Sequence, residues 1–276
     1  MNSSTQLKAL IRNMSKDKKI NAQILLRNYM LERLLERIAV SKYRDEFILK
    51  GGMLVAAMVG IDTRSTMDMD ATIKGQAVNK DNIENILNEI VALDIGDNVK
   101  MSLKSIEEIR NEAEYPGLRA SIQTEFDGIT NMLKLDMTTG DMIVPKEIIY
   151  EFKLMFEDRI LKVKAYNIET VLAEKIETII TRTTANTRMR DYYDVYIIMT
   201  MYKDLVSNDL LNDAIIKVSE NRDTTHILKD KTTILKEIAN SVQMKYRWER
   251  YQSKYSYAKE IQWNYIIIVL KEYIGG

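Results

Sequence analysis

The hydrophobic pattern of this chain changes its period near residue 166, and this change restricts the folds that the chain can adopt. Before that point, short apolar runs with strand-like alternation are mixed with helical stretches, whereas from Ile168 onward apolar residues recur at three- and four-residue spacing. The pattern predicts an α/β (α+β) protein, with a mixed sheet flanked by helices in residues 1–166 and an all-helical domain in residues 167–276. A chain of 276 residues is long enough for two such domains.

Local patterns place the elements of the first domain. Helical spacing predicts helices over residues 22–38 and 79–93, and FILKGG (47–52) is typical of a short strand that ends in a glycine turn before the apolar helical stretch MLVAAMVG. Alternation predicts a strand over MDMDATI (67–73). In the second domain, Asn167 is a suitable N-cap for the helix IETVLAEKIETIITR.

Three further strands are predicted over residues 99–109, 118–126 and 131–137. Between the last two lies FDGIT, whose Asp-Gly pair favours a tight hairpin turn. The sequence therefore predicts an antiparallel extension of the sheet.

Composition excludes several classes of site. Lys and Arg number 40, as do Asp and Glu, so the net charge gives no sign of a nucleic-acid partner. The absence of cysteine excludes disulfides and thiolate metal sites, and it suits a reducing cytoplasm. His226 is the only histidine, which makes a Ser-His-Asp triad or a multi-histidine zinc site unfavourable; we expect it in a loop or cap.

Neither end of the chain indicates secretion or a membrane. The first residues carry charges where a signal peptide has its apolar region. The apolar run over residues 265–270 is far shorter than the roughly 20 residues that cross a bilayer. We therefore expect a cytoplasmic protein without a membrane partner.

Three aspartates carry the chemistry that the pattern suggests. Asp68 and Asp70 are two apart in a predicted strand, so their carboxylates project to the same side. In the strand KLDMTT, Leu135 and Met137 would face one way and Asp136 the other. Magnesium binds carboxylate and phosphate oxygens, so convergence of the three would make a site for Mg²⁺ or Mn²⁺ at a nucleotide. A D-x-D pair alone is equally compatible with a solvated strand edge.

The turn Lys50-Gly51-Gly52 lies between the strand and the helix that precede the D-x-D pair. Glycines let the backbone approach a phosphate, and a helix N-terminus offers free N–H donors. An ordinary strand-to-helix turn is the alternative interpretation. Context favours phosphate binding, because the turn precedes the segment Arg64-Ser65-Thr66-Met67-Asp68-Met69-Asp70 by one helix.

An ordered series of motifs spans roughly residues 47–200: FILKGG, R-S-T-x-D-x-D, KLD, LAEKIETI and R-x-R-D-Y-Y-D. This series resembles the AbiEii/AbiGii toxin family of bacterial abortive-infection and toxin–antitoxin systems. Its glycine turn, helix and D-x-D strand resemble the first motif of the polymerase-beta-like nucleotidyltransferase superfamily. Gly52 stands where many members of that superfamily have serine, so a phosphate contact there would come from the backbone.

The resemblance implies a nucleotidyltransferase-like fold and assigns roles to residues. It implies metal ligands at Asp68, Asp70 and Asp136, and catalytic roles for these three with Lys175 and Asp191. It implies nucleotide contacts from Lys50, Gly51, Gly52, Arg64, Thr66 and Lys175.

Lys175 and Asp191 both lie on predicted helices, and the resemblance implies their roles. The Lys175 ammonium would stabilise triphosphate charge, and Asp191 would position or deprotonate a reactant. Asp194 shares a helix face with Asp191 and would orient Lys175 or an arginine. The alternatives are an exposed helix lysine and acidic residues favoured by the helix dipole.

The activity implied by the resemblance is transfer of a nucleotidyl group from an NTP, with magnesium, to an acceptor such as tRNA or another RNA. A separate antitoxin would neutralise this toxin. We expect the nucleotide between the two domains, with Lys175 and Asp191 opposite the aspartates and the helical domain completing the cleft. The alternatives are a non-catalytic toxin that sequesters nucleotide or RNA, and a structural helical protein.

Basic residues with neighbouring aromatics predict where RNA would dock. The set is Arg182, Arg188 and Arg190, with Lys245, Arg247, Arg250, Lys254 and Lys259 interleaved with Tyr246, Trp248, Tyr251, Tyr255 and Tyr257. Alternatively the charges surround a helix–helix loop and the aromatics pack helices, which we favour for most of the aromatics.

Overall fold

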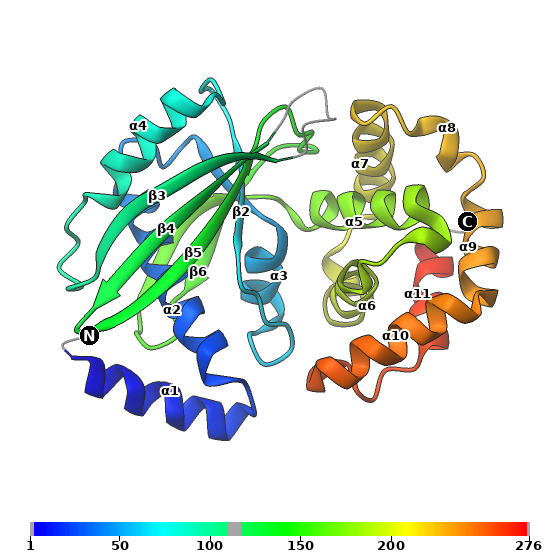
Figure 1. Cartoon of the computed structure of the whole chain (residues 1–276). Coiled ribbons are helices and arrows are strands. Elements are labelled where there is room, and N and C mark those ends of the chain that lie inside the picture. The colour runs from blue at the N-terminus through cyan, green and yellow to red at the C-terminus, as the bar shows by residue number, and fades with distance from the viewer. Residues whose placement is uncertain (1–2, 110–116, 275–276) are drawn as a thin grey trace. The chain divides into compact units, whose positions relative to one another are not determined.

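The computed structural model describes residues 3–109 and 117–274, which divide into two compact units (Figure 1). Unit 1 comprises Met1–Gly140 and Ile148–Ala165, and unit 2 comprises Asp141–Glu147 and Tyr166–Gly276. The chain thus visits unit 2 briefly before it completes unit 1. The hydrophobic pattern predicts a single boundary near residue 166. It does not predict that Asp141–Glu147 belongs to unit 2.

Within the described residues, unit 1 holds a seven-stranded mixed sheet in the order β3-β4-β5-β2-β1-β7-β6. The pairs β2/β5 and β1/β7 are parallel and the other pairs are antiparallel, which confirms the predicted mixed sheet. The strands are β1 Phe47–Lys50, β2 Met69–Ile73, β3 Lys100–Ile109, β4 Gly117–Phe126, β5 Ile129–Thr138, β6 Ile148–Lys153 and β7 Ile160–Ala165.

The predicted Asp-Gly hairpin joins β4 and β5. Asp127 and Gly128 have φ angles of 45° and 77°, and positive φ at both central residues is what a two-residue turn matched to strand twist requires. Phe126 pairs with Ile129, and the ladder continues to Leu118 opposite Met137. The turn therefore fixes the register of the whole hairpin.

Two strand predictions need correction. The strand predicted over residues 67–73 begins only at Met69, so Asp68 precedes β2. The antiparallel hairpin of β6 and β7 was not predicted, although residues 161–165 alternate between apolar residues and lysines. Ile149 and Ile160 are 60% and 50% exposed, so apolar residues stand on its solvent side.

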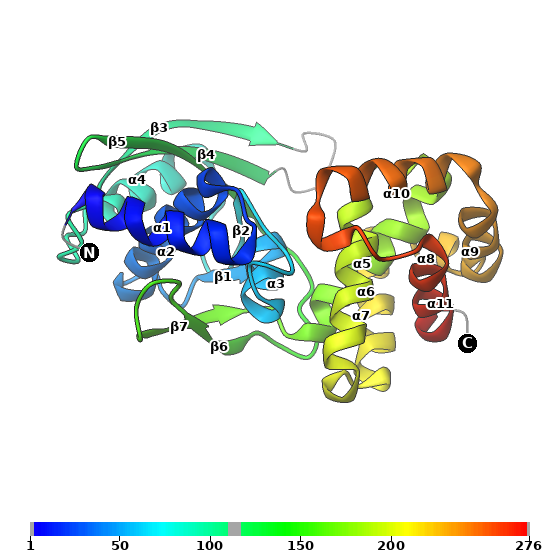
Figure 2. The same ribbon diagram turned by 90° about the horizontal axis from the view of Figure 1, so that it is seen from below.

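Helix α2 covers the centre of one sheet face in unit 1 (Figure 2). It contacts β5 and β7, and its Leu35 and Ile38 line a small cavity together with Met69 and Ala71 of β2. Because side chains alternate along a strand, Asp70 projects to the opposite face. The helices of unit 1 are α1 Ser4–Lys18, α2 Ala22–Val40, α3 Gly51–Val59 and α4 Lys80–Val91.

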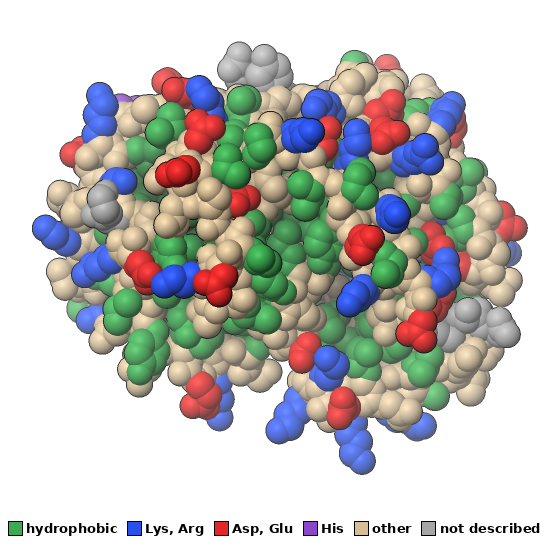
Figure 3. All heavy atoms as spheres, turned by 180° about the vertical axis from the view of Figure 1, so that it is seen from behind, with side chains coloured by type: hydrophobic (Ala, Val, Ile, Leu, Met, Phe, Trp, Pro, Cys, Tyr) green, Lys and Arg blue, Asp and Glu red, His purple; other side chains and the backbone are tan. Residues whose placement is uncertain are grey.

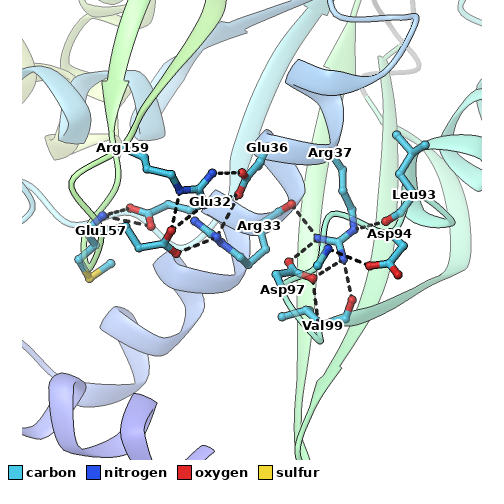
Figure 4. Close-up of polar contacts among 12 residues, drawn as sticks. Glu32, Arg33, Glu36, Arg37, Leu93, Asp94, Asp97, Val99, Glu157 and Arg159 are labelled. Atoms are coloured by element: carbon cyan, nitrogen blue, oxygen red, sulfur yellow. Dashed lines mark hydrogen bonds and ion pairs between the residues drawn. The ribbon is translucent and has the colours of Figure 1, made fainter. Parts of the chain in front are cut away.

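Buried charged residues of α2 bind the loop between α4 and β3 and the loop between β6 and β7 (Figure 4). Arg37 forms two hydrogen bonds with Asp97, at 2.7 and 2.8 Å, and also donates to the carbonyls of Leu93 and Val99. These bonds hold the segment between α4 and β3. Buried ion pairs of this kind satisfy loop carbonyls that would otherwise lose their contact with water.

A second group on α2 contains more carboxylates than cations (Figure 4). Glu32, Glu36 and Glu157 surround Arg33 and Arg159, with Arg33 3.0 Å from both Glu36 and Glu157. Glu32 accepts a hydrogen bond from the Met155 backbone N–H at 3.0 Å. Burial raises the pKa of Glu32 to about 8, since ionising it would add an uncompensated charge.

We expect Glu32→Gln to change how stability depends on pH. The folded pKa of Glu32, about 8, lies above its ordinary value of 4.5. Its contribution to stability is therefore complete below about pH 4.5 and is lost as pH rises through 8. Relative to the variant, the parent should lose free energy of unfolding on the order of a few kcal/mol between pH 5 and 8.5.

Urea unfolding at several pH values measures this difference. Glu84→Gln, on the exposed face of α4, serves as the control and should keep the parent's pH dependence. Parallel curves for the parent and Glu32→Gln would contradict the assignment.

From Ile168 to Ile274, unit 2 is built of helices joined by loops and short 3-10 turns. Asn167 caps α5 by accepting the Thr170 N–H at 2.8 Å, as predicted, and its amide donates to the carbonyls of Val144 and Lys146. This cap ties the excursion to the helical unit. The helices are α5 Ile168–Arg182, α6 Met189–Tyr202, α7 Asn208–Asn221, α8 Thr225–Leu228, α9 Lys231–Asn240, α10 Val242–Lys254 and α11 Trp263–Ile274.

Aromatic rings form much of the core of unit 2. Trp248 lies 5.3 Å from Tyr251 and 6.2 Å from Trp263 between ring centroids, and its indole N–H donates to the Ile261 carbonyl. Tyr246 is 58% exposed. Most aromatic residues of the tail thus pack between helices, which is the interpretation that we favoured.

Two expectations remain, one about the single histidine and one about membrane-spanning helices. His226, which we expected in a loop or cap, lies instead within the short helix α8, where it is exposed. Across residues 3–109 and 117–274, no helix has the length and apolar character needed to span a bilayer.

Candidate active site

Two of the three predicted aspartates are direct neighbours in the sheet. Asp70 of β2 pairs in register with Asp136 of β5, so both carboxylates lie on the face opposite α2. Asp68 lies two residues before Asp70 and is near enough to Arg119 for its charge to raise the pKa of that guanidinium. Asp70 and Asp136 thus share one face, whereas the convergence of Asp68 with them stays a prediction.

Arg119 of β4 is the site residue that sequence reasoning missed. It stands opposite Asp136 in the hairpin and forms two hydrogen bonds with that carboxylate, both at 2.7 Å. The hydrogen bond with Asp136 is the main cause that raises the pKa of Arg119, and the charges of Asp68 and Asp70 add to it. The guanidinium therefore supplies the positive charge that the aspartates require.

The register extends into a row of charges across five neighbouring strands, which we call the charge row. It consists of Glu107, Arg119, Asp136, Asp70 and Lys50, each opposite the next across adjacent strands. Residues that are opposite in neighbouring strands project to the same face. Lys50 is 6% exposed, whereas Glu107 at the other end is exposed.

The glycine turn lies against Asp70. Gly51 has a φ of +63°, and a Cβ there would stand 2.3 Å from Asp70 Oδ2. The Gly52 N–H donates to the same oxygen at 3.4 Å. Only glycine satisfies both the backbone angle and this close approach.

Arg64 and Thr66 lie over the first turn of α3. A Cβ on Gly52 would be 2.9 Å from Thr66 Oγ1 and 3.0 Å from an Arg64 guanidinium nitrogen. Both side chains are buried, and Asn28 donates to the Thr66 carbonyl at 2.8 Å, which holds the segment in place. A serine at position 52 would require these side chains to move, so the glycine matches this arrangement.

We expect Gly51→Ala to be much more damaging than Gly75→Ala. Both glycines have positive φ, but a Cβ on Gly75 meets nothing within 4 Å. The shared cost of the backbone angle cancels in the comparison, leaving the clash with Asp70. The free energy of unfolding should fall by about 1–3 kcal/mol more for Gly51→Ala, as for other overpacked positions. Denaturant unfolding of the two variants checks this, and equal losses would contradict it.

Lys175 forms ion pairs in unit 2 with the buried Asp191 and Asp194, and Arg188 joins this cluster from the surface. Lys175 Nζ lies 2.6 Å from Asp194 Oδ2 and 3.3 Å from Asp191 Oδ1, while Arg188 Nε lies 3.1 Å from Asp191 Oδ2. Lys175 is 11% exposed and Asp194 0%, so the alternative of an exposed helix lysine is wrong and Asp194 orients Lys175 as predicted. Asp191 also lies in the first turn of α6, where the helix dipole favours an acid.

Several residues of the predicted RNA surface hold unit 2 together instead. Arg190 donates to the Tyr255 hydroxyl at 2.8 Å, and Arg247 donates to the carbonyls of Thr184 and Asn186. The exposed basic residues of the predicted set are Arg182, Arg188, Lys245, Arg250, Lys254 and Lys259. Figure 3 shows basic and acidic side chains intermixed over the visible surface.

The carboxylates fit a hard divalent cation in chemistry and in register. Among the residues that the structure describes, no three histidine, aspartate or glutamate side chains form a ready metal-binding group. Asp136 is instead turned to Arg119. The Arg119 side chain is 36% exposed and that of Asp136 is 16% exposed, so solvent screens the pair and a divalent cation would compete with Arg119 for this carboxylate. Asp68 and Asp70 would hold such a cation, and Asp136 would join them.

Comparison with solved structures shows the same fold in two proteins of Helicobacter pylori. A candidate nucleotidyltransferase matches with a TM-score of 0.53 and 15% identity, over 93% of this chain and 96% of its own. The protein JHP933 matches with a TM-score of 0.52 and 15% identity, over 93% and 94% of the two chains. The fold is thus of the nucleotidyltransferase type.

A family model assigns the chain more narrowly. The model of the nucleotidyl transferase AbiEii toxins of type IV toxin–antitoxin systems matches residues 33–266, and the chain belongs to this family. A search of curated protein sequences finds no match. Membership confirms the resemblance noted in the motifs, and it implies an antitoxin as partner.

Proposed function

We propose that this toxin transfers a nucleotidyl group from an NTP to a hydroxyl of an RNA, tRNA being a candidate, in a reaction that depends on Mg²⁺. The observation that carries the proposal is the pairing of Asp70 with Asp136 beside the glycine turn at the start of α3. Growth inhibition would follow from modification of the RNA. The setting we propose is abortive infection, in which a bacterium stops growing when a phage infects it.

The chemistry proposed is substitution at the α-phosphorus of the NTP. The acceptor oxygen forms a bond to phosphorus, its proton passes to a carboxylate, and the bond to the bridging oxygen breaks to release pyrophosphate. When bound, a divalent cation supplies neutralisation of phosphate charge and activation of the attacking oxygen. Asp68, Asp70 and Asp136 are the residues that would hold it.

Residues around α3 would bind the phosphates. The backbone at Gly51 and Gly52 leaves room for a close approach, and a helix N-terminus favours an anion. The buried Arg64 guanidinium lies beside this turn and adds positive charge. Lys50 lies opposite Asp70 and would limit repulsion between the carboxylates and the triphosphate.

In unit 2, Lys175 would stabilise the negative charge of the triphosphate, and Asp191 would position a reactant. Each is buried in an ion-pair cluster that fixes its orientation. That Lys175 and Asp191 act on the nucleotide held by the aspartates stays a prediction.

The test is transfer of label. Purified protein is incubated with each α-³²P-labelled NTP, Mg²⁺ and total cellular RNA, and the labelled molecule is identified. The proposal expects a labelled RNA that is lost with EDTA and is absent when the label is on the γ-phosphate. Label on a protein or small molecule would replace the acceptor, and absence of transfer to any molecule would overturn the enzymatic proposal.

The RNA-binding surface has a separate test. Phosphate contacts release counterions, so RNA affinity should fall steeply with salt, and removing exposed basic residues should flatten that slope. Arg182 and Arg250 are exposed, whereas Arg188 and Arg190 have protein partners whose loss would disturb the fold. Affinities across a salt series for the parent and Arg182→Ala/Arg250→Ala measure this. Identical slopes would place the RNA elsewhere.

A further inference from the structure

The charge row places Arg119 between two acidic neighbours. Asp136 is opposite on β5 and binds the guanidinium with both oxygens, whereas Glu107 is opposite on β3. Arg119 is therefore a cation in the centre of carboxylates that the proposed reaction needs for Mg²⁺. Because Arg119 occupies both oxygens of Asp136, a metal ion that binds this carboxylate must displace at least one of these hydrogen bonds, and the two positive charges repel each other.

We infer that Arg119 is a positioning residue that holds Asp136 while no metal is bound and turns to the triphosphate of the NTP when a divalent cation takes over the carboxylates. This inference rests on the proposed function. It gives Arg119 two roles that the motifs did not indicate. The guanidinium competes with the metal for Asp136, and it then binds the phosphates.

Exposure makes this exchange feasible. The side chain of Arg119 is 36% exposed and that of Asp136 is 16% exposed, so water reaches both partners and screens their attraction. A guanidinium stays charged at any accessible pH, so Arg119 keeps its positive charge whichever partner it binds. A planar guanidinium binds carboxylate and phosphate with the same paired geometry, which allows one side chain to change partner.

The inference requires opposite changes in the affinities for two ions. Replacing Arg119 by methionine frees Asp136, so Mn²⁺ alone should bind roughly tenfold more tightly, as expected for removal of one neighbouring positive charge. With the metal site saturated by Mn²⁺, inorganic tripolyphosphate should bind roughly tenfold more weakly, because the guanidinium that turns to the phosphates is gone. A merely structural role for Arg119 would weaken both.

The experiment measures, by calorimetry, binding of Mn²⁺ alone and then of tripolyphosphate at saturating Mn²⁺. It compares the full-length parent with Arg119→Met, Arg119→Lys and Lys134→Met, and thermal unfolding checks that each variant is folded. Lys134 is the matched control, because it is exposed on the same face of β5 two residues from Asp136 and removes the same charge. Arg119→Lys keeps the charge without the paired geometry and should change both affinities in the same directions, but less.

The outcomes separate this inference from the proposed function. Tighter Mn²⁺ and weaker tripolyphosphate binding in Arg119→Met, with little change in Lys134→Met, support it. If the parent binds Mn²⁺ and Arg119→Met binds it equally or less tightly, the inference is overturned and the metal site stands. If Lys134→Met changes both affinities as much as Arg119→Met does, the effect comes from the net charge of the surface alone, and the inference is also overturned. If neither the parent nor Arg119→Met binds Mn²⁺, both the inference and the metal-dependent function fail.

Discussion

Asp70→Asn is expected to abolish nucleotidyl transfer and growth inhibition, with a loss on the order of a thousandfold or more, while unit 1 stays folded. The substitution removes one of two neighbouring carboxylates but keeps an oxygen that can accept the Gly52 N–H. Like charges opposite each other destabilise a sheet, so the variant should be at least as stable as the parent.

Label transfer, growth inhibition and unfolding are measured together for this variant. Asp62→Asn is the control, since Asp62 lies in the segment leading to β2 but pairs with Lys18 at the surface. It should retain activity. Full growth inhibition by a folded Asp70→Asn protein would remove the enzymatic account and favour a toxin that sequesters nucleotide or RNA.

Lys175→Met is expected to destabilise unit 2 severely as well as to remove activity. Asp194 is 0% exposed and its nearest cation is Lys175 at 2.6 Å, so the variant leaves a buried carboxylate without that charge. Breaking a buried ion pair by removing one partner costs about 3–5 kcal/mol.

A double variant separates structure from chemistry at Lys175. Lys175→Met/Asp194→Asn removes both members of the buried pair and should recover most of the free energy of unfolding, but no transfer activity. Lys203→Met is the control, because its pair with Glu272 has a similar length at the surface and should matter little. Recovery of activity in the double variant would assign Lys175 a structural role alone.

The sequence predicted the parts of the site that local patterns determine. The glycine turn, the D-x-D segment and the Asp-Gly hairpin are each defined by residues within a few positions of one another. The predicted hairpin also determines the partner of Arg119. A two-residue turn pairs Phe126 with Ile129, and the same register pairs Arg119 with Asp136. Following this register across the strands would have found the arginine that the motifs do not include.

Other features depend on contacts that no local pattern records. The charged residues of α2 are typical of a solvated helix face, yet Arg33 and Arg37 are 1% and 2% exposed because connections from distant parts of unit 1 cover them. The visit of Asp141–Glu147 to unit 2 depends on the cap at Asn167, whose amide reaches Val144.

The hairpin turn gives the site a remote determinant. Asp127 lies nine residues before Asp136, which corresponds to about 30 Å along an extended strand. Inserting a single residue there would slide β4 past β5, and Arg119 would no longer face Asp136. The length of an outlying loop therefore decides which side chain balances the charge of Asp136, so redesign of that loop would also redesign the candidate site.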